Sequence, residues 1–266
     1  MSKSASRHVR KTRGLKIEQE IAPVHKPKFN EETSTQPSLP KLTVASEKQH
    51  KQLSYLQEGR QAVWAIGASG SGKSIIAAYH GAMLLKQKRI EKILLVRPVV
   101  YVGNSVGMIK GTLTEKLEPW FKQTIAHFEK FLGKAYTRYC LDKGIIEYCA
   151  VEYLRGYSFE HTYVICEESQ GFTSQEYEMM LTRIGEGSQV CFTGDERQSA
   201  AKDKSGLSDL MRMIDKHLDE QPEYLDDDDL DELESNIGVV RYEVEDIQRS
   251  GLVKAFCKMY YFKENK

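Results

Sequence analysis

The sequence predicts an α/β fold, in which a mainly parallel sheet lies between two layers of helices. Short apolar runs alternate along the chain with longer stretches whose apolar residues recur at helical spacing. The runs are apolar on both sides of the expected strand, which is typical of parallel strands that helices cover on both faces. A three-layer α/β/α domain over residues 46–266 accounts for both observations.

The expected elements can be placed in order along this domain. The apolar runs that predict strands are 62–66, 93–96, 145–151, 163–166, 190–193 and 239–244. The stretches that predict helices are 49–57, 74–88, 114–132, 173–182 and 247–260. The fourth helix opens with Thr173-Ser174-Gln175-Glu176, which fits a capping box, and Pro119 is expected to kink the third. The acidic stretch 219–235 interrupts the alternation and is expected to loop out as an insertion.

Composition excludes several classes of protein. Of the 266 residues, 40% are hydrophobic and 29% are charged, which suits a globular domain with a real core. Lysine plus arginine equals aspartate plus glutamate at 38 each, so net charge predicts no polyanionic partner. The five cysteines and seven histidines show no metal spacing, and the cysteines are typical of a reducing compartment. With neither a membrane-length apolar stretch nor a signal-peptide core, the sequence predicts a cytoplasmic protein without membrane contact.

Residues 1–45 differ from the rest of the chain. They are polar, hold four of the seven prolines and are rich in lysine and arginine over the first thirty positions. This composition predicts a disordered basic arm. Such an arm can contact nucleic acid or act as a solubilising leader, and the scarcity of aromatic residues, with Phe29 alone, favours the leader.

One glycine-rich segment indicates a chemistry. It fits the pattern G-x-x-x-x-G-K-[ST] and consists of Gly67, Ala68, Ser69, Gly70, Ser71, Gly72, Lys73 and Ser74. A buried strand precedes it and a helix follows, which is the context of a phosphate-binding P-loop. Glycines let backbone N–H groups and the new helix N-terminus face the phosphates. Lys73 is expected to reach the β- and γ-phosphates, and the Ser74 hydroxyl to bind Mg²⁺.

P-loop chemistry also needs an acidic site on a neighbouring strand. The run 163–166 ends in Glu167 and Glu168, which we interpret as the metal-side acid and the catalytic base, respectively. Taken alone, such a pair could be solvated or cap a helix, but the P-loop favours the functional interpretation. Gln198 follows the strand 190–193, and it is a candidate to orient the attacking water or sense the γ-phosphate. Because the carboxyl ends of parallel strands share one sheet edge, these segments are expected to converge.

Together these segments resemble the PhoH-like family of P-loop ATPases, whose core is similar to the RecA-like first domain of superfamily-one helicases. The resemblance covers about residues 52–260. Besides the P-loop, the matching segments are 95–100 (Leu-Val-Arg-Pro-Val-Val), 151–156 (Val-Glu-Tyr-Leu-Arg-Gly), 167–170 (Glu-Glu-Ser-Gln), 181–185 (Leu-Thr-Arg-Ile-Gly), 193–198, 204–207 and 246–249 (Asp-Ile-Gln-Arg). The Arg-Pro-Val and Thr-Arg-Ile-Gly segments are specific to this family.

The resemblance assigns further roles. Gln52 is similar to the upstream glutamine that contacts the adenine edge, which implies ATP as the nucleotide. Arg249 resembles the arginine that neutralises transition-state charge, supplied in cis or by a neighbouring subunit, and Arg183 is a second candidate. Arg97 and Arg155 stand where the family contacts nucleic acid or transmits the nucleotide state. Each arginine can instead form a structural ion pair.

Two hypotheses about function follow. The first is an Mg²⁺-dependent ATPase coupled to RNA or single-stranded nucleic acid, acting as a homo-oligomer such as a ring because one domain alone cannot move as a two-domain helicase does. The second is an ATP-switched module with little hydrolysis that regulates a protein partner such as a ribonuclease. Its basis is Glu167, where the family usually has aspartate. A kinase is a weaker third alternative, since no second substrate site is marked. The short form resembles bacteriophage versions, which implies a bacterial host cytoplasm.

Overall fold

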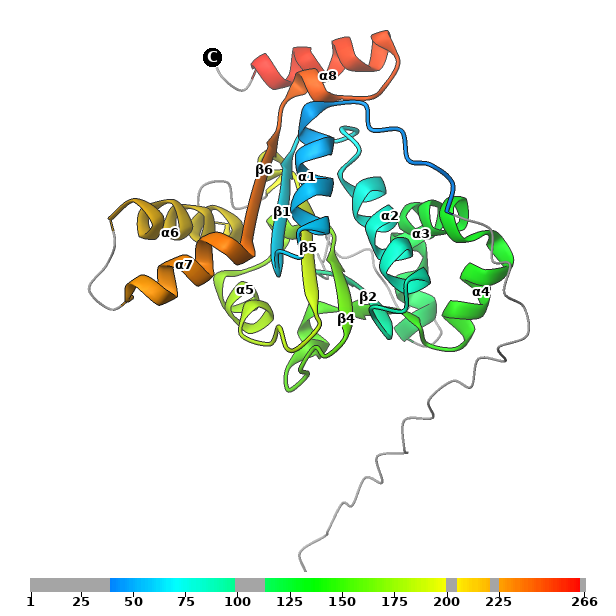
Figure 1. Ribbon diagram of the computed structural model, residues 1–266. Helices are drawn as coiled ribbons and strands as arrows, with labels where there is room; N and C mark the ends of the chain where they lie inside the picture. Colours follow the sequence, from blue (N-terminus) through cyan, green and yellow to red (C-terminus); the bar gives the residue numbers. More distant parts are fainter. Residues whose placement is uncertain (1–38, 99–112, 200–204, 221–224, 264–266) are drawn as a thin grey trace, which may run out of the picture. The chain divides into compact units, whose positions relative to one another are not determined.

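The computed structural model describes residues 39–98, 113–199, 205–220 and 225–263 (Figure 1). Most of the expected basic arm, residues 1–38, therefore lies outside the described residues. Residues 39–45 have no regular secondary structure, and the first helix, α1 (Glu47–Gln57), begins after Ser46. The Ser46 hydroxyl accepts a hydrogen bond from the Gln49 N–H, which caps the helix.

The centre of the fold is a six-stranded sheet in which every pairing is parallel. Its spatial order is β3-β2-β4-β5-β1-β6. The strands are β1 (Ala62–Gly67), β2 (Lys92–Arg97), β3 (Ile146–Ala150), β4 (Thr162–Cys166), β5 (Gln189–Gly194) and β6 (Ile237–Tyr242). All six predicted strands are confirmed, although β6 begins and ends two residues earlier than expected. The predicted parallel α/β fold is therefore correct.

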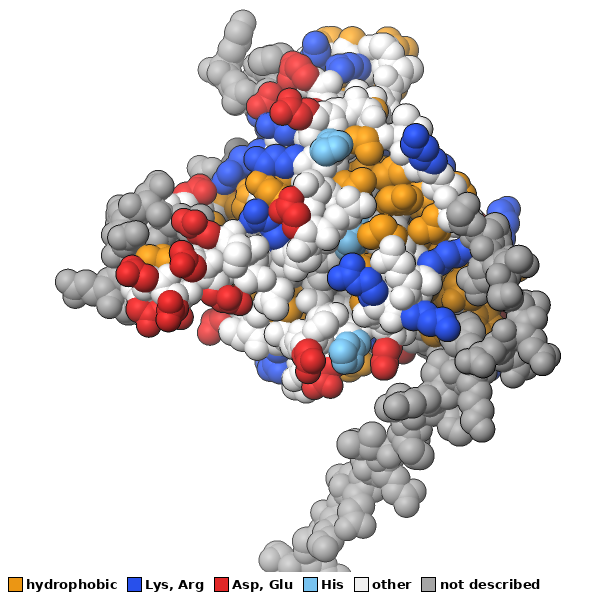
Figure 2. Space-filling view, in the orientation of Figure 1, with side chains coloured by type: hydrophobic (Ala, Val, Ile, Leu, Met, Phe, Trp, Pro, Cys, Tyr) orange, Lys and Arg blue, Asp and Glu red, His pale blue; other side chains and the backbone are white. Residues whose placement is uncertain are grey.

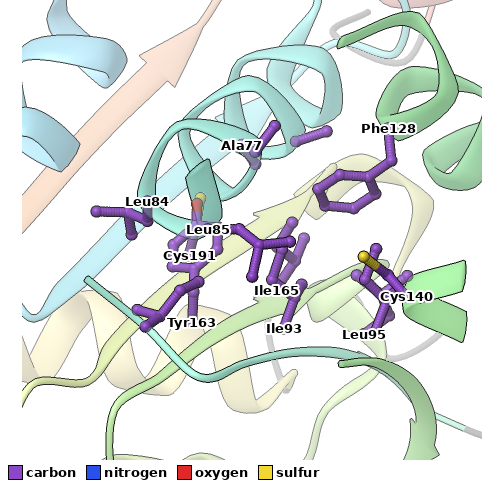
Figure 3. Close-up of a cluster of buried hydrophobic side chains, with 14 of the residues drawn as sticks. Ala77, Leu84, Leu85, Ile93, Leu95, Phe128, Cys140, Tyr163, Ile165 and Cys191 are labelled. Atoms are coloured by element: carbon purple, nitrogen blue, oxygen red, sulfur yellow. The ribbon is translucent and has the colours of Figure 1, made fainter. Parts of the chain in front are cut away.

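Helices cover both faces of the sheet, and strand residues alternate between two apolar clusters. Val63 belongs to the first cluster and Trp64 to the second, and both side chains are buried. The first cluster joins the sheet to α1, α2 (Lys73–Lys86), α3 (Leu113–Leu132) and α4 (Lys134–Asp142). Figure 3 shows part of it, with Ala77 and Phe128 over Ile93 and Ile165. The second cluster joins the sheet to α5 (Ser174–Leu181) and α6 (Gly206–Glu220).

The helices agree with the sequence in some places and correct it in others. The capping box at Thr173 and Glu176 is present and opens α5 as predicted. Helix α3 continues through Pro119. Helices α4 and α6 were not predicted, although Leu207, Leu210 and Ile214 give α6 a buried face at helical spacing.

The acidic stretch is the clearest correction. Much of it does not loop out but forms α7 (Asp227–Asn236). Asp226 and Asp229 make a reciprocal capping box, and the acidic first turn suits the positive end of the helix dipole. Leu230 is buried and anchors the helix. The last helix, α8 (Gly251–Lys263), begins four residues later than expected because Val244–Asp246 first form a 3₁₀ turn, η6.

The structure also bears on the cysteines and on the expected lack of membrane-spanning helices. All five cysteines have free thiols, and burial raises the pKa of Cys140 and Cys149 to about 11 and that of Cys191 to about 12. Raised pKa values make these thiols poor nucleophiles. Among the described helices, none combines the length and apolar character that a membrane crossing requires.

Candidate functional site

The topology brings the predicted site segments to one place. The P-loop follows β1, Glu167 and Glu168 follow β4, and the segment with Gln198 follows β5. Because β4, β5 and β1 are consecutive in a parallel sheet, their carboxyl ends lie side by side. The segment that holds Arg249 follows β6, which pairs with β1 on its other side. The sheet thus gathers all four segments at its carboxyl edge.

The P-loop is folded against the end of β6 and against α1. Gly67 has φ +124°, and a Cβ at this position would overlap the carbonyl oxygen of Tyr242. Gly72 has φ +90° and is the N-cap of α2; a Cβ there would lie 2.5 Å from Nε2 of Gln49. Only glycine accepts both the positive φ and the close approach without strain. The glycine pattern of the motif therefore has a structural reason at both of its ends.

Lys73 lies inside the loop that it completes. Its Nζ donates hydrogen bonds to the carbonyl oxygens of Gly67 at 2.6 Å and Ala68 at 2.8 Å. Burial lowers the pKa of Lys73 to about 8, and the charges of Asp195 and Glu168 act in the opposite direction. The carboxylates that follow β4 and β5 therefore act electrostatically on this ammonium group. Ser74, the second residue of α2, is partly exposed.

Two glutamines of α1 support the loop from behind. Gln49 Nε2 donates to the carbonyl of Ser71 at 2.8 Å, and Gln52 Nε2 donates to the carbonyl of Lys73 at 3.0 Å. The Gln52 Oε1 accepts a 2.6 Å bond from the Tyr242 hydroxyl, and the Gln52 side chain is fully buried. In this structure Gln52 joins α1, the P-loop and β6. Contact with an adenine edge would need this amide to change partners, so that role stays a prediction.

Glu167 and Glu168 have opposite environments despite being adjacent. Glu167 is buried and accepts a hydrogen bond from the Thr124 hydroxyl of α3. Burial raises the pKa of Glu167 above its usual range, while the Thr124 bond and the Arg97 charge act to lower it. Glu168 has a left-handed backbone (φ +51°) and a side chain 43% exposed. It lies 3.4 Å from the Arg97 guanidinium and accepts a 2.7 Å bond from Gln170.

The segment after β5 adds a third carboxylate. Asp195 is the N-cap of a short 3₁₀ turn, η4 (Glu196–Gln198), and its Oδ2 accepts a 3.1 Å bond from the Gln198 amide. Its backbone N–H donates to Gln170 Oε1 at 3.0 Å, which ties the ends of β5 and β4 together. The structure thus places Gln198 beside the carboxylate that faces Lys73.

The four candidate arginines lie in different parts of the structure. Arg249 is exposed and lies over the P-loop. A Cβ built on Gly70 would lie 3.0 Å from the Nε of Arg249. The neighbouring Gln248 N–H donates to the Gly70 carbonyl at 2.9 Å. Arg97 bonds the Trp120 carbonyl at 2.9 Å besides pairing with Glu168. Arg183 donates a hydrogen bond to the Tyr157 carbonyl. Arg183 precedes β5 and Tyr157 precedes β4, so both residues lie toward the amino ends of the strands, away from the P-loop. Arg155 is exposed on the chain that follows β3.

Residues that the sequence interpretation missed surround those that it named. Thr124, Gln49 and Tyr242 each contact a predicted site residue from another element. Gln49 was detectable, because it precedes Gln52 by three positions and shares its face of α1. Nothing in the local sequence marks Thr124 or Tyr242, whose roles come from the packing of α3 and from the register of β6.

The donor set fits a magnesium–nucleotide complex. Mg²⁺ prefers oxygen ligands and usually takes one or two carboxylates together with the phosphates of its substrate. The Ser74 hydroxyl and the second oxygen of Glu167 are oxygen donors of this kind and could hold the ion. Among the described residues there is no cluster of three or more His, Cys, Asp or Glu side chains that could hold a metal alone.

A sequence model of the PhoH-like protein family matches residues 41–261. The chain belongs to this family. Protein PhoH of Escherichia coli strain K12 is 32% identical over 213 residues, which cover 79% of this chain and 56% of that protein. The PhoH-like protein of Bacillus subtilis strain 168 is 36% identical over 154 residues, which cover 57% of this chain and 48% of that protein. This PhoH-like chain thus spans about half the length of the curated relatives that it matches.

A more distant similarity comes from a solved structure. The Sulfolobus solfataricus SWI2/SNF2 ATPase core in complex with dsDNA matches 78% of this PhoH-like chain and 46% of its own chain, with 14% sequence identity and a TM-score of 0.41. No conclusion about function rests on a similarity of this size.

Proposed function

We propose that the chain is an Mg²⁺-dependent ATPase coupled to RNA or another single-stranded nucleic acid. The observation that carries this proposal is the arrangement at the carboxyl ends of β4, β5 and β1. There a P-loop lysine is buried against loop carbonyls and faces the carboxylates of Asp195 and Glu168. A cation inside a glycine-rich loop, opposed by acids on adjacent strands, is the arrangement that binds and hydrolyses nucleoside triphosphates.

Each residue at the site has a distinct task in this proposal. Gly67 to Ser74 bind the phosphates, with Lys73 neutralising their charge and Ser74 holding Mg²⁺ together with Glu167. Glu168, half exposed, acts as general base on water, and Gln198 helps to orient that water. Arg249, which already lies over the loop, stabilises charge on the transferred phosphoryl group. The metal, when bound, supplies further neutralisation of the phosphate charge.

The nucleic-acid half of the proposal is supported by one exposed loop. Arg155 lies there between Tyr153, which is 63% exposed, and Tyr157, which is 41% exposed. Exposed aromatic rings beside a cation suit the stacking of unpaired bases and contact with their phosphates. The loop continues from β3, whose neighbour β2 ends at Arg97, the partner of Glu168.

An ATPase assay with and without single-stranded RNA tests both halves. We expect hydrolysis that requires Mg²⁺ and that becomes faster when RNA is added. We expect the Lys73→Ala variant to show no hydrolysis. Tyr153→Ala is expected to lose the stimulation but keep the basal rate, with Tyr139→Ala, an exposed tyrosine on α4, as the matched control. A basal rate that no polynucleotide changes would refute the coupling, and no hydrolysis at all would refute the enzyme.

A second candidate function rests on Glu167. This acid is buried and held by Thr124, and its raised pKa weakens it as a metal ligand. A chain that binds ATP tightly but hydrolyses it slowly would act as a switch on a protein partner such as a ribonuclease. Glu167→Asp separates the alternatives, since a large gain in turnover supports the switch and a loss or no change supports the ATPase.

The proposal extends to assembly and location. Because one such domain offers a single strand-binding face, we propose that it works as a homo-oligomer, such as a ring, in a bacterial host cytoplasm. In this proposal the chain comprises a basic arm at residues 1–45 and an ATPase domain at 46–266. Sedimentation in the presence of Mg²⁺ and ATP tests the oligomer, and a species that is monomeric at all concentrations would contradict it.

A further inference from the structure

Acidic side chains are placed in two different ways in this molecule. Those of α7 gather on an outer flank, where Figure 2 shows them at the surface and all of them are exposed. Glu168 instead has a side-chain partner on each of its carboxylate oxygens. Its Oε2 accepts a 2.7 Å hydrogen bond from the Gln170 amide, and its Oε1 lies 3.4 Å from the Arg97 guanidinium. Neighbouring residues therefore fix the direction of this carboxylate.

Glu168 also has a backbone conformation that glutamate rarely adopts. Its φ of +51° lies in the left-handed region, which is strained for any residue with a Cβ. The structure around it holds this conformation in place. The Glu168 carbonyl accepts from the Gly171 N–H at 2.9 Å, and the Tyr177 hydroxyl donates to the Ser169 carbonyl at 2.8 Å. Strain of this kind persists where the surroundings enforce it, and here it directs the Glu168 side chain toward Gln170.

Gln170 is buried between the ends of β4 and β5, and only 6% of its surface is exposed. Its Oε1 accepts a 3.0 Å hydrogen bond from the Asp195 backbone N–H. Because a backbone N–H can only donate, this bond fixes the oxygen end of the amide and leaves the NH₂ group for Glu168. An ionised carboxylate can only accept, so both partners select the same orientation of the Gln170 amide.

Gly194, the last residue of β5, makes room for this side chain. A Cβ built on Gly194 would lie 2.7 Å from Gln170 Oε1 and 2.6 Å from Ser169 Oγ. Any larger residue would displace the Gln170 amide from the Asp195 N–H. A glycine in a strand often marks such a close approach of another segment. The ends of β4 and β5 are therefore shaped around Gln170.

The same hydrogen bonds extend to the residue that we assign to orienting water. Gln198 Nε2 donates to Asp195 Oδ2 at 3.1 Å, and the Asp195 N–H donates to Gln170. We propose that Gln170 is a positioning residue, which holds the Glu168 carboxylate in register with Gln198 so that both act on one water molecule. This inference rests on the proposed function, because it gives Gln170 a task in hydrolysis alone.

Gln170→Met tests the proposal, because methionine has a similar length but cannot make the two amide hydrogen bonds. Turnover should fall by about tenfold to a hundredfold, since a misplaced base loses much of its effect. Affinity for a fluorescent ATP analogue should stay within about twofold, because the hydrogen bonds of Gln170 go to Glu168 and Asp195 rather than to residues 67–74. Gln175→Met replaces an exposed glutamine of α5 and is the control, with wild-type turnover expected.

A double variant separates positioning of the base from a structural tie between the two strands. With Glu168→Gln already present, Gln170→Met should slow the residual hydrolysis by less than about twofold, because no base is left to position. A residue that only stabilises the strand ends would slow hydrolysis by the same factor in both backgrounds. Equal factors would therefore overturn the proposal.

Urea unfolding of the same samples shows whether each variant is folded. If Gln170→Met does not fold, Gln170→Asn replaces it in both experiments, because its amide is one methylene too short to join Asp195 to Glu168 and the same loss of turnover is expected. A folded variant with wild-type turnover, or one that loses affinity together with turnover, would overturn the positioning role and leave the proposed function standing. A wild type that does not hydrolyse ATP would overturn the proposed function, and this inference with it.

Discussion

The two sides of the candidate site are built differently. The phosphate side, residues 67–74, is held from other elements by neutral amides: Gln49 and Gln52 donate to its backbone, and the Gln248 N–H donates to the carbonyl of Gly70. Its own Lys73 adds a charged contact to the Gly67 and Ala68 carbonyls. The acid side, residues 167–168, is held by ionisable and hydroxyl groups, with Thr124 on Glu167 and Arg97 beside Glu168. The amide contacts do not titrate, whereas the Thr124 bond and the Arg97 charge act on the proton affinity of Glu167.

On the proposed function, this difference gives the two sides separate tasks. The phosphate side would determine whether the triphosphate binds. The acid side would determine whether bound nucleotide turns over, since it combines an exposed carboxylate with a buried one whose pKa is raised by burial. Changes on the phosphate side should therefore alter affinity and stability, and changes on the acid side should alter turnover and its pH dependence.

The largest effect is expected from Lys73→Ala. Removing the Lys73 ammonium, which on the proposed function neutralises the phosphates, should lower ATP affinity and hydrolysis by at least about a hundredfold. Equilibrium binding of a fluorescent ATP analogue measures it, with Lys86→Ala on the last turn of the same helix as control. Unchanged affinity in Lys73→Ala would break the assignment of residues 67–74 as the phosphate side.

Gln52→Ala should act on stability. It leaves the Lys73 carbonyl and the Tyr242 hydroxyl without their partner in a buried place, which costs about 1–3 kcal/mol of the free energy of unfolding. Urea unfolding measures this cost. If Gln52 instead contacts adenine, as the resemblance implies, the variant will lose its preference for ATP over GTP with little change in stability.

ATP affinity should depend on pH through Lys73. The bound triphosphate favours the charged ammonium, so affinity should fall up to about tenfold per unit as pH rises past about 8, the pKa of Lys73 in the folded protein. Without ligand the sign reverses: the unfolded chain holds this proton up to pH 10.5, so stability gains from this group between about pH 8 and 10.5. Lys73→Arg keeps its charge, and its affinity profile should be flat over this range.

The smallest effect is expected from Thr124→Val. The Thr124 hydroxyl lowers the pKa of Glu167 against the effect of burial, so its loss should raise that pKa further. This further rise moves the acid limb of the ATPase pH profile upward, so the rate should fall severalfold at acid pH and change little at alkaline pH. Thr124→Ser keeps the hydroxyl and should keep the profile. An unshifted acid limb in the valine variant would remove Thr124 from the acid side.

The fold was largely predictable because its signals are local. Apolar runs such as 163–166 mark buried strands, and the P-loop fixes the first strand–turn–helix unit. Much of the site followed as well, since chain order at the ends of parallel strands predicts that Lys73, Glu168 and Gln198 converge. The partners of these residues were not predictable. Thr124 reaches Glu167 from α3, 43 positions away, and Tyr242 reaches Gln52 from 190 positions away.

The acidic stretch shows a different limit. Its charge density suggested a loop, yet reciprocal capping by Asp226 and Asp229 and one buried leucine, Leu230, are enough for a helix. Average polarity carries less information here than the placement of two side chains. Helix α8 shows a related limit. Its apolar periodicity predicts a helix, but the sequence does not tell what covers the exposed apolar residues.

The most direct test compares Glu168→Gln with the wild type in one experiment that measures ATP affinity and the single-turnover rate of hydrolysis. The isosteric amide removes the proposed base but leaves residues 67–74 untouched, and loss of the partly exposed Arg97 pair should cost little. We expect affinity within about twofold of the wild type and hydrolysis slower by at least about a hundredfold. A variant that hydrolyses ATP at the wild-type rate, or that loses affinity together with turnover, would contradict the division of the site into a binding side and a turnover side.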